Sequence, residues 1–370
     1  MKFLPKKVFS LGTIVWLHVS FSLVLIIAWT MIKRGWDFRV TSFPNEWFYI
    51  SGGPDVFNVA AIMIGAMFRC LHFNHLTFYL FNVFVSAATV VVFFHLARTC
   101  LGRKLSLYVT AIFAFNPEFG LYNNFVLKEN LLILVLIVAM YCFFKALATN
   151  RVVYEILFTL ILPLIGLLRE PLVLMGFLPL AFFRKSMRRL ICFFGVVVAC
   201  SLLYLMREQA DVLIKAYSAS HLGNYGATKV ILEDIYGAPT SVTFGEVFGS
   251  PALLAEYFFR SFLYYIRPGW NTGVKLNSVL IPYTLFVVYV FVASFRFRKY
   301  LVSSYHTAYM LIALIVIALS LILILYDPIE RYRYSVFQLA FTLLVLNLTG
   351  YQECLRQGRC ATRGVVAGNY

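Results

Sequence analysis

The sequence predicts an all-α polytopic membrane protein with about ten transmembrane helices, and three observations carry this prediction. Of the 370 residues, 61% are hydrophobic and only 13% are charged. The apolar residues form long uninterrupted runs, several of them near the ~20 residues that a helix needs to cross a bilayer. The Lys and Arg residues gather in alternate loops between these runs. Soluble domains are about half apolar and a quarter charged, so that class is excluded.

Eight runs have the length of a span: 8–32, 76–97, 129–148, 152–168, 190–206, 279–295, 305–326 and 335–351. The first run follows three Lys residues but has no small-residue cleavage site, so we expect a retained span rather than a removed signal peptide. Two further runs, 105–115 and 171–183, are too short to cross alone. We expect their outer ends to stop inside the protein at membrane depth, where polar residues can line a wet cavity.

The run 56–71 is ambiguous, because its length would also allow a span. If it lies along the outer surface, 18 of the 32 Lys and Arg residues face the cytoplasm together with only two acids. The outer side then has 14 basic and 14 acidic residues. A span at 56–71 would instead put four basic loops outside, against the positive-inside rule. We therefore expect ten spans with both termini cytoplasmic. The basic residues behind the net charge of +16 then contact anionic lipids on the cytoplasmic side, and the charge indicates no nucleic-acid partner.

This topology gives one transmembrane domain over residues 1–370. Residues 33–75 form the first outer loop, which includes an interfacial helix, and residues 352–370 form a cytoplasmic tail. Residues 207–277 form the large fourth outer loop, whose aromatic stretch is also typical of a membrane interface.

Three acids of the first outer loop are candidate catalytic bases. Asp55 follows a Gly-Gly-Pro turn, where it either caps the interfacial helix or acts as a general base at the membrane surface. Glu46 lies among aromatic residues that would favour its protonated form, or it is a solvated loop acid. Asp37 stands two residues before Arg39 and is either a base or an ion-paired anchor.

Further charged residues lie at the outer ends of later spans. Lys128 and Glu129 stand at the head of the span 129–148, after the short run 105–115 and a turn that contains Glu118, so we expect both to be partly buried. Arg169 and Glu170 lie in a tight hairpin between apolar residues, where charges are costly unless they are paired or used. For Glu129, helix capping is an alternative role.

The last outer turn reads Glu330-Arg331-Tyr332-Arg333. Arg offers forked donors that suit phosphate oxygens, and Tyr offers a surface on which a sugar ring can stack. An internally neutralised turn is the alternative. These outer segments converge on one membrane face. Carboxylates and the cationic Lys and Arg side chains are therefore expected to meet where a lipid-linked sugar presents its phosphate.

The sequence requires no cofactor. The seven Cys residues show no zinc or disulfide-framework spacing, and we expect Cys354 to be a free thiol. The six His residues show no ligand spacing, so no metal ligand is predicted and metal dependence stays open.

These motifs resemble the GT-C superfamily of integral-membrane glycosyltransferases, in particular the bacterial relatives of protein mannosyltransferases and of the aminoarabinose transferase that modifies lipid A. Gly53-Pro54-Asp55, followed by Ala60 and Met63, is similar to the family's catalytic Asp before an amphipathic helix. Pro44-Asn45-Glu46 with Tyr49 is similar to a variant Asp-Glu pair, with Asn45 in place of the Asp. The segments around 116–129, Arg169 with Pro171, and 330–332 look like later family signatures.

The resemblance implies an inverting hexosyl- or pentosyltransferase of the bacterial inner membrane, with its site facing the periplasm or exterior. Its donor would be a polyprenyl-phosphate-linked sugar, and its acceptor a glycan or lipid-linked molecule of the cell envelope. Asp55, Glu46 or Asp37 would be the base. The donor phosphate would be held by Lys128, Arg169, Arg331 and Arg333, with support from Glu118, Glu129, Glu170, Glu330 and Tyr332. An O-antigen-type polymerase and a lipid-linked sugar flippase or transporter are the alternative functions.

Overall fold

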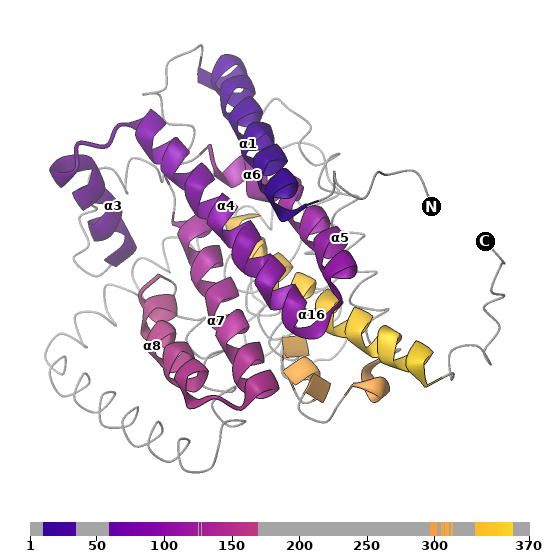
Figure 1. Ribbon diagram of the computed structural model, residues 1–370. Helices are drawn as coiled ribbons and strands as arrows, with labels where there is room; N and C mark the ends of the chain where they lie inside the picture. The colour runs from indigo at the N-terminus through magenta and orange to yellow at the C-terminus, as the bar shows by residue number, and fades with distance from the viewer. Residues whose placement is uncertain are drawn as a thin grey trace, which may run out of the picture.

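Three of the predicted spans form helices that are long and apolar enough to cross a membrane. They are α1 (Leu11–Arg34), α4 (His75–Cys100) and α7 (Glu129–Thr149), and they indicate a membrane protein. The computed structural model describes residues 10–34, 59–124, 126, 128–168, 297–301, 305–306, 308–310, 312–313 and 330–357. All regular structure in these ranges is helical, so the all-α prediction is confirmed for them (Figure 1).

Two further predicted spans are also helical. The helix α8 (Val152–Leu168) has the predicted bounds and contains Pro163. The helix α16 (Glu330–Arg356) contains the predicted span 335–351 and extends beyond it at both ends. Runs 171–183, 190–206 and 279–295, together with most of 305–326, lie outside the described residues, and so does the loop 207–277.

Apolar side chains cover the outer faces of α1 and α8. On α1, Val24 is 61% exposed, and on α8, Leu160 is 65% exposed. Exposed apolar faces on long helices are costly in water and are stable in contact with lipid. These faces therefore support a location within a bilayer.

The ambiguous run 56–71 forms a short helix, α3 (Val59–Cys70). Its 12 described residues rise about 18 Å, which is less than the ~30 Å hydrocarbon core. The chain then reverses through His72, which has a left-handed φ of 53°. A capping box starts α4, in which Asn74 Oδ1 accepts from the Thr77 amide at 2.8 Å and Thr77 Oγ1 accepts from the Asn74 amide at 2.7 Å.

The run 105–115 forms α5 (Arg103–Ala114), which is also only 12 residues long. A short helix, α6 (Pro117–Tyr122), follows and leads back to α7. The α5–α6 turn lies against the middle of α1 (Figure 1). A Cβ atom at Gly120 would stand 2.6 Å from Leu25 Cδ1 and 3.0 Å from Phe21 Cε1, so glycine allows this close approach. As predicted, the short run ends inside the helical bundle.

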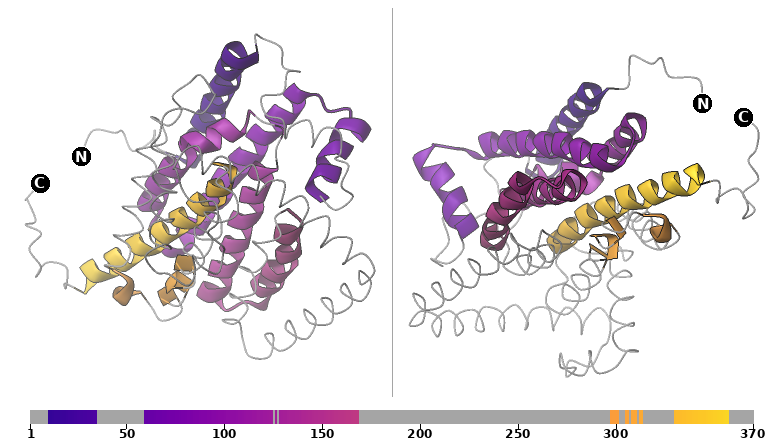
Figure 2. Two further views of the ribbon diagram at one scale, coloured as in Figure 1. Left: turned by 180° about the vertical axis from the view of Figure 1, so that it is seen from behind. Right: turned by 60° about the horizontal axis from the view of Figure 1, so that its bottom comes forward.

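The helix ends that adjoin the basic loops of the predicted cytoplasmic side lie together at one end of the bundle. Cys100, at the end of α4, shares a hydrogen bond with Tyr305, whose ring stacks on Phe144 near the end of α7. The 3-10 helix η1 (Arg298–Tyr300) adjoins the last turns of α16, where a Cβ at Gly350 would stand 2.6 Å from the Phe297 carbonyl oxygen. Viewed from behind, α16 starts near α7 and diverges from it as it runs toward this end (Figure 2). We call it the basic end.

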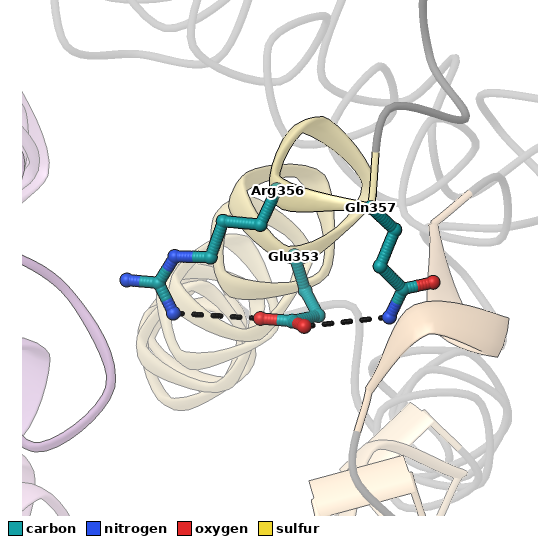
Figure 3. Close-up of polar contacts among 3 residues, drawn as sticks. All are labelled: Glu353, Arg356 and Gln357. Carbon is teal, nitrogen blue, oxygen red and sulfur yellow. Dashed lines mark hydrogen bonds and ion pairs between the residues drawn. The ribbon is translucent and has the colours of Figure 1, made fainter.

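The last turn of α16 is polar and exposed. Glu353 Oε2 lies 3.4 Å from Arg356 Nη1, and Gln357 Nε2 donates to Glu353 Oε1 at 3.3 Å (Figure 3). Arg356 also lies where a cation favours the helix dipole. Cys354, on the same turn, is disulfide-bonded, so the prediction of a free thiol is wrong.

Candidate functional site

A buried histidine joins three helices near the α5–α6 turn. His18 of α1 is 0% exposed, and its Nδ1 donates to the Ala114 carbonyl at the end of α5 at 2.7 Å. Its Nε2 lies 2.9 Å from the Ser86 hydroxyl of α4. The imidazole also packs against Phe119 of α6 at 5.2 Å between ring centroids. Because a carbonyl only accepts, Nδ1 carries a proton in this arrangement. The contacts hold the end of α5 against α1 and α4.

A second buried network connects α1 to the head of α7. Asn123, just after α6, donates from Nδ2 to the Ser22 hydroxyl of α1 at 2.9 Å. Its Oδ1 accepts from Asn130 Nδ2 of α7 at 2.7 Å. All three side chains are buried. Since interior hydrogen bonds are strong and directional, this chain of amides sets how α7 begins relative to α1.

The candidate charged pair lies beside this network. Lys128 is 9% exposed and occupies the N-cap position of α7, and Glu129, the first helical residue, is 1% exposed. The predicted burial at the head of the span is therefore observed. An acid in the first turn is favoured by the helix dipole, which offsets part of the cost of burying Glu129.

The head of α7 thus combines a buried cation, a buried carboxylate and several buried side-chain amides. Asn124 and Asn130 are buried there, Asn124 Nδ2 donates to the Gly120 carbonyl at 3.3 Å, and Asn116 is buried at the turn after α5. Charges away from water in a membrane protein are costly and commonly mark a functional site. A lysine and amide donors together suit an anionic ligand that also carries hydroxyl groups. Within the described residues, no group of three or more His, Cys, Asp or Glu side chains could hold a metal ion.

The remaining predicted site residues are placed only in part. Residues that lie outside the described ranges are Asp37, Glu46, Asp55, Arg169 and Glu170. Glu118 lies on α6, between the end of α5 and the head of α7, close in the chain to Lys128.

Residues 330–333 of the predicted last outer turn are helical. They belong to α16 rather than to a loop, and this corrects the sequence prediction for these residues. Glu and Arg are good helix formers, so their charges do not interrupt the helix. Positions 331 and 333 are separated by about 200° around the axis and do not share a face.

Sequence reasoning missed the buried polar residues of the first span. His18 and Ser22 are four residues apart and so lie on one face of α1. That spacing of two polar residues within an apolar run was an available signal. Their partners on α4, α5 and the turn before α7 are up to 101 residues away in the chain, and no local pattern identifies them.

Compared with protein families, curated proteins and solved structures, the chain matches none of them.

Proposed function

We propose that this protein is a membrane glycosyltransferase of the GT-C type. It transfers a sugar from a polyprenyl-phosphate donor to a glycan or lipid-linked acceptor at the outer face of the membrane. The observation that carries the proposal is the buried Lys128–Glu129 pair at the head of α7, beside a network of amides within a bundle of apolar helices. A cation with adjoining amide groups suits a lipid phosphate that bears a sugar.

The proposed reaction is a single displacement with inversion. Asp55, or Glu46 as second choice, takes the proton of an acceptor hydroxyl, and the oxygen attacks the anomeric carbon. The bond from that carbon to the phosphate oxygen breaks, and the lipid phosphate leaves with its negative charge. Lys128, Arg169 and Arg331 stabilise that charge, and Glu129 orients a neighbouring cation.

In the proposed topology, ten spans cross a bacterial inner membrane and both termini lie in the cytoplasm. The gathering of Arg98–Lys104, Lys145, Arg298 and Arg356 at the basic end supports it, because positively charged segments are retained on the cytoplasmic side. The head of α7 then faces outward, which is the side where a periplasmic acceptor would arrive.

The test is transfer by purified protein in lipid nanodiscs. Polyprenyl phosphates that carry a radiolabelled mannose, glucose, galactose or aminoarabinose are supplied with an envelope lipid extract as acceptor. We expect label to move from donor to acceptor with at least one sugar, and Lys128→Met to slow the transfer at least tenfold. Lys145→Met, on the same helix at the basic end, is the matched control and should retain activity. No transfer with any donor, or equal rates for both variants, contradicts the proposal.

A flippase for lipid-linked sugars is the second candidate. His18, Ser22 and Ser86 are polar residues near the middle of α1 and α4, and α5 ends within the bundle. Transporters place polar and interrupted helices at that depth. The same donors in sealed vesicles distinguish the two functions: a flippase moves labelled lipid between leaflets without breaking the sugar–phosphate bond, and the proposed transferase breaks it.

A further inference from the structure

Gln338 of α16 is a buried amide whose hydrogen-bonding capacity the described protein leaves unused. It is 1% exposed, and neither Oε1 nor Nε2 has a hydrogen-bond partner among the described residues. Its backbone carbonyl accepts from Thr342 Oγ1 at 3.0 Å, so only the side-chain amide lacks a hydrogen-bond partner in the described part of the chain. An amide buried without a partner is destabilising, and such a group in a native protein needs an explanation.

The face of α16 that carries Gln338 packs against α4 and α5. Phe341, three residues further along, lies 6.1 Å from the ring of Phe93 and 5.3 Å from the ring of Phe113, measured between centroids. Residues three apart share a helix face. Gln338 therefore lies on the same side as Phe341, about 4.5 Å closer to the start of α16.

Measured along the axis of α16, Gln338 also lies at the level of the α5–α6 turn. The helices α5 and α16 run in opposite directions, because α5 begins and α16 ends toward the basic end. Moving from Phe341 toward the start of α16 therefore means moving past Phe113 toward the end of α5, where Asn116 is buried. The helix α16 also packs against α7. The unused amide is thus at the level of the candidate site.

Helix register relates Gln338 to one of the two candidate arginines. Position 331 is seven residues before Gln338 and about 20° away around the axis, at a rise of about 10 Å. Position 333 is about 140° away and belongs to another face. The face that carries the buried amide therefore includes position 331 and excludes position 333.

We propose that the Gln338 amide hydrogen-bonds the sugar of the lipid-phosphate donor, while Lys128 holds its phosphate. This inference rests on the proposed function and identifies its sugar-recognising residue. An amide has donors and an acceptor, so it can bind neighbouring hydroxyl groups at the same time. Gln338 takes no part in proton transfer or bond breaking, and it contributes through affinity for the sugar.

The test compares Gln338→Leu with Asn347→Leu. Asn347 is a buried amide of the same helix, 8% exposed, with no partner for Oδ1 among the described residues. It lies nine residues further on, about half a turn away from Gln338, and so is a matched control. The probes are polyprenyl phosphate alone and the same lipid carrying mannose, glucose, galactose or aminoarabinose, with binding measured on nanodisc-embedded protein.

We expect at least one sugar to raise affinity above that of the bare lipid phosphate. Gln338→Leu should lose this gain, about three- to tenfold, without changing the affinity for the bare lipid phosphate. Asn347→Leu should keep it. If the bare lipid phosphate binds but no sugar adds affinity, or if Gln338→Leu keeps the gain, this inference is overturned and the proposed function is not. If the bare lipid phosphate fails to bind, both are overturned.

Thermal unfolding without ligand tests the same residue independently. Leucine removes an amide that has no partner among the described residues, so Gln338→Leu should unfold at the wild-type temperature or above. A lower unfolding temperature would show that the amide bonds within the protein or to a structural water, and would overturn the inference.

Discussion

The two ends of α7 differ in whether their charged side chains are buried or exposed to solvent. At the head, Lys128 and Glu129 are buried beside a chain of hydrogen-bonded amides. At the other end, Arg151 is exposed just after the helix, and Glu353 and Arg356 form an exposed ion pair on the neighbouring α16. Solvated basic residues at a helix end are explained by membrane orientation alone. Membrane orientation does not explain the buried charges at the head, so the head of α7 is the part of the described protein that most resembles a functional site.

The largest expected effect concerns the base that would act at the outer face. Asp55→Asn keeps the size of the side chain but cannot accept the hydroxyl proton, so transfer should fall by about 10²–10⁴-fold. The measurement is the labelled-sugar transfer rate, with protein yield and unfolding temperature as folding controls. Full activity in Asp55→Asn together with loss in Glu46→Gln would assign the base to Glu46 instead.

The amide network at the head should contribute most to stability. Asn123→Leu removes the partner of both Ser22 and Asn130 and leaves buried polar groups behind, at a cost of about 1–3 kcal/mol. Thermal or denaturant unfolding in detergent measures this cost. A double-mutant cycle with Asn130→Leu should show coupling between the two residues, and strictly additive effects would contradict the network.

The His18 contacts should contribute less. Ser86→Ala removes one hydrogen bond between α1 and α4, and such bonds within membranes contribute about 0.6 kcal/mol on average and up to about 1.7. The unfolding temperature should fall by a small but measurable amount. An unchanged value in Ser86→Ala combined with a large loss in His18→Leu would mean that the bond to the Ala114 carbonyl carries the contribution of His18.

The smallest effect is expected at the basic end. Glu353→Gln breaks the 3.4 Å contact with Arg356, which is an exposed pair. Such pairs contribute about 0–1 kcal/mol, so unfolding should be almost unchanged and transfer unaffected. A destabilisation as large as that of Asn123→Leu would remove the proposed distinction between the two ends.

The sequence predicted the long helices well because apolar runs of span length have few alternative structures. The short helix α5 and the burial of Lys128 and Glu129 followed from the same argument on length. The prediction of a turn at 330–333 is wrong, because Glu and Arg favour helices although they are charged. The contacts of His18 and Asn123 depend on tertiary packing between distant segments. That Gln338 has no partner among the described residues is also visible only in the folded structure.

The central claim is that a lipid phosphate binds at the head of α7, and photocrosslinking tests it most directly. A polyprenyl phosphate with a photoreactive group near its phosphate is irradiated with the nanodisc-embedded protein, and the adducts are mapped by mass spectrometry. We predict adducts within residues 116–130 that excess unlabelled polyprenyl phosphate abolishes and that Lys128→Met strongly reduces. Adducts confined to the lipid-facing residues of α1 and α8, such as Val24 and Leu160, and insensitive to Lys128→Met would contradict the claim.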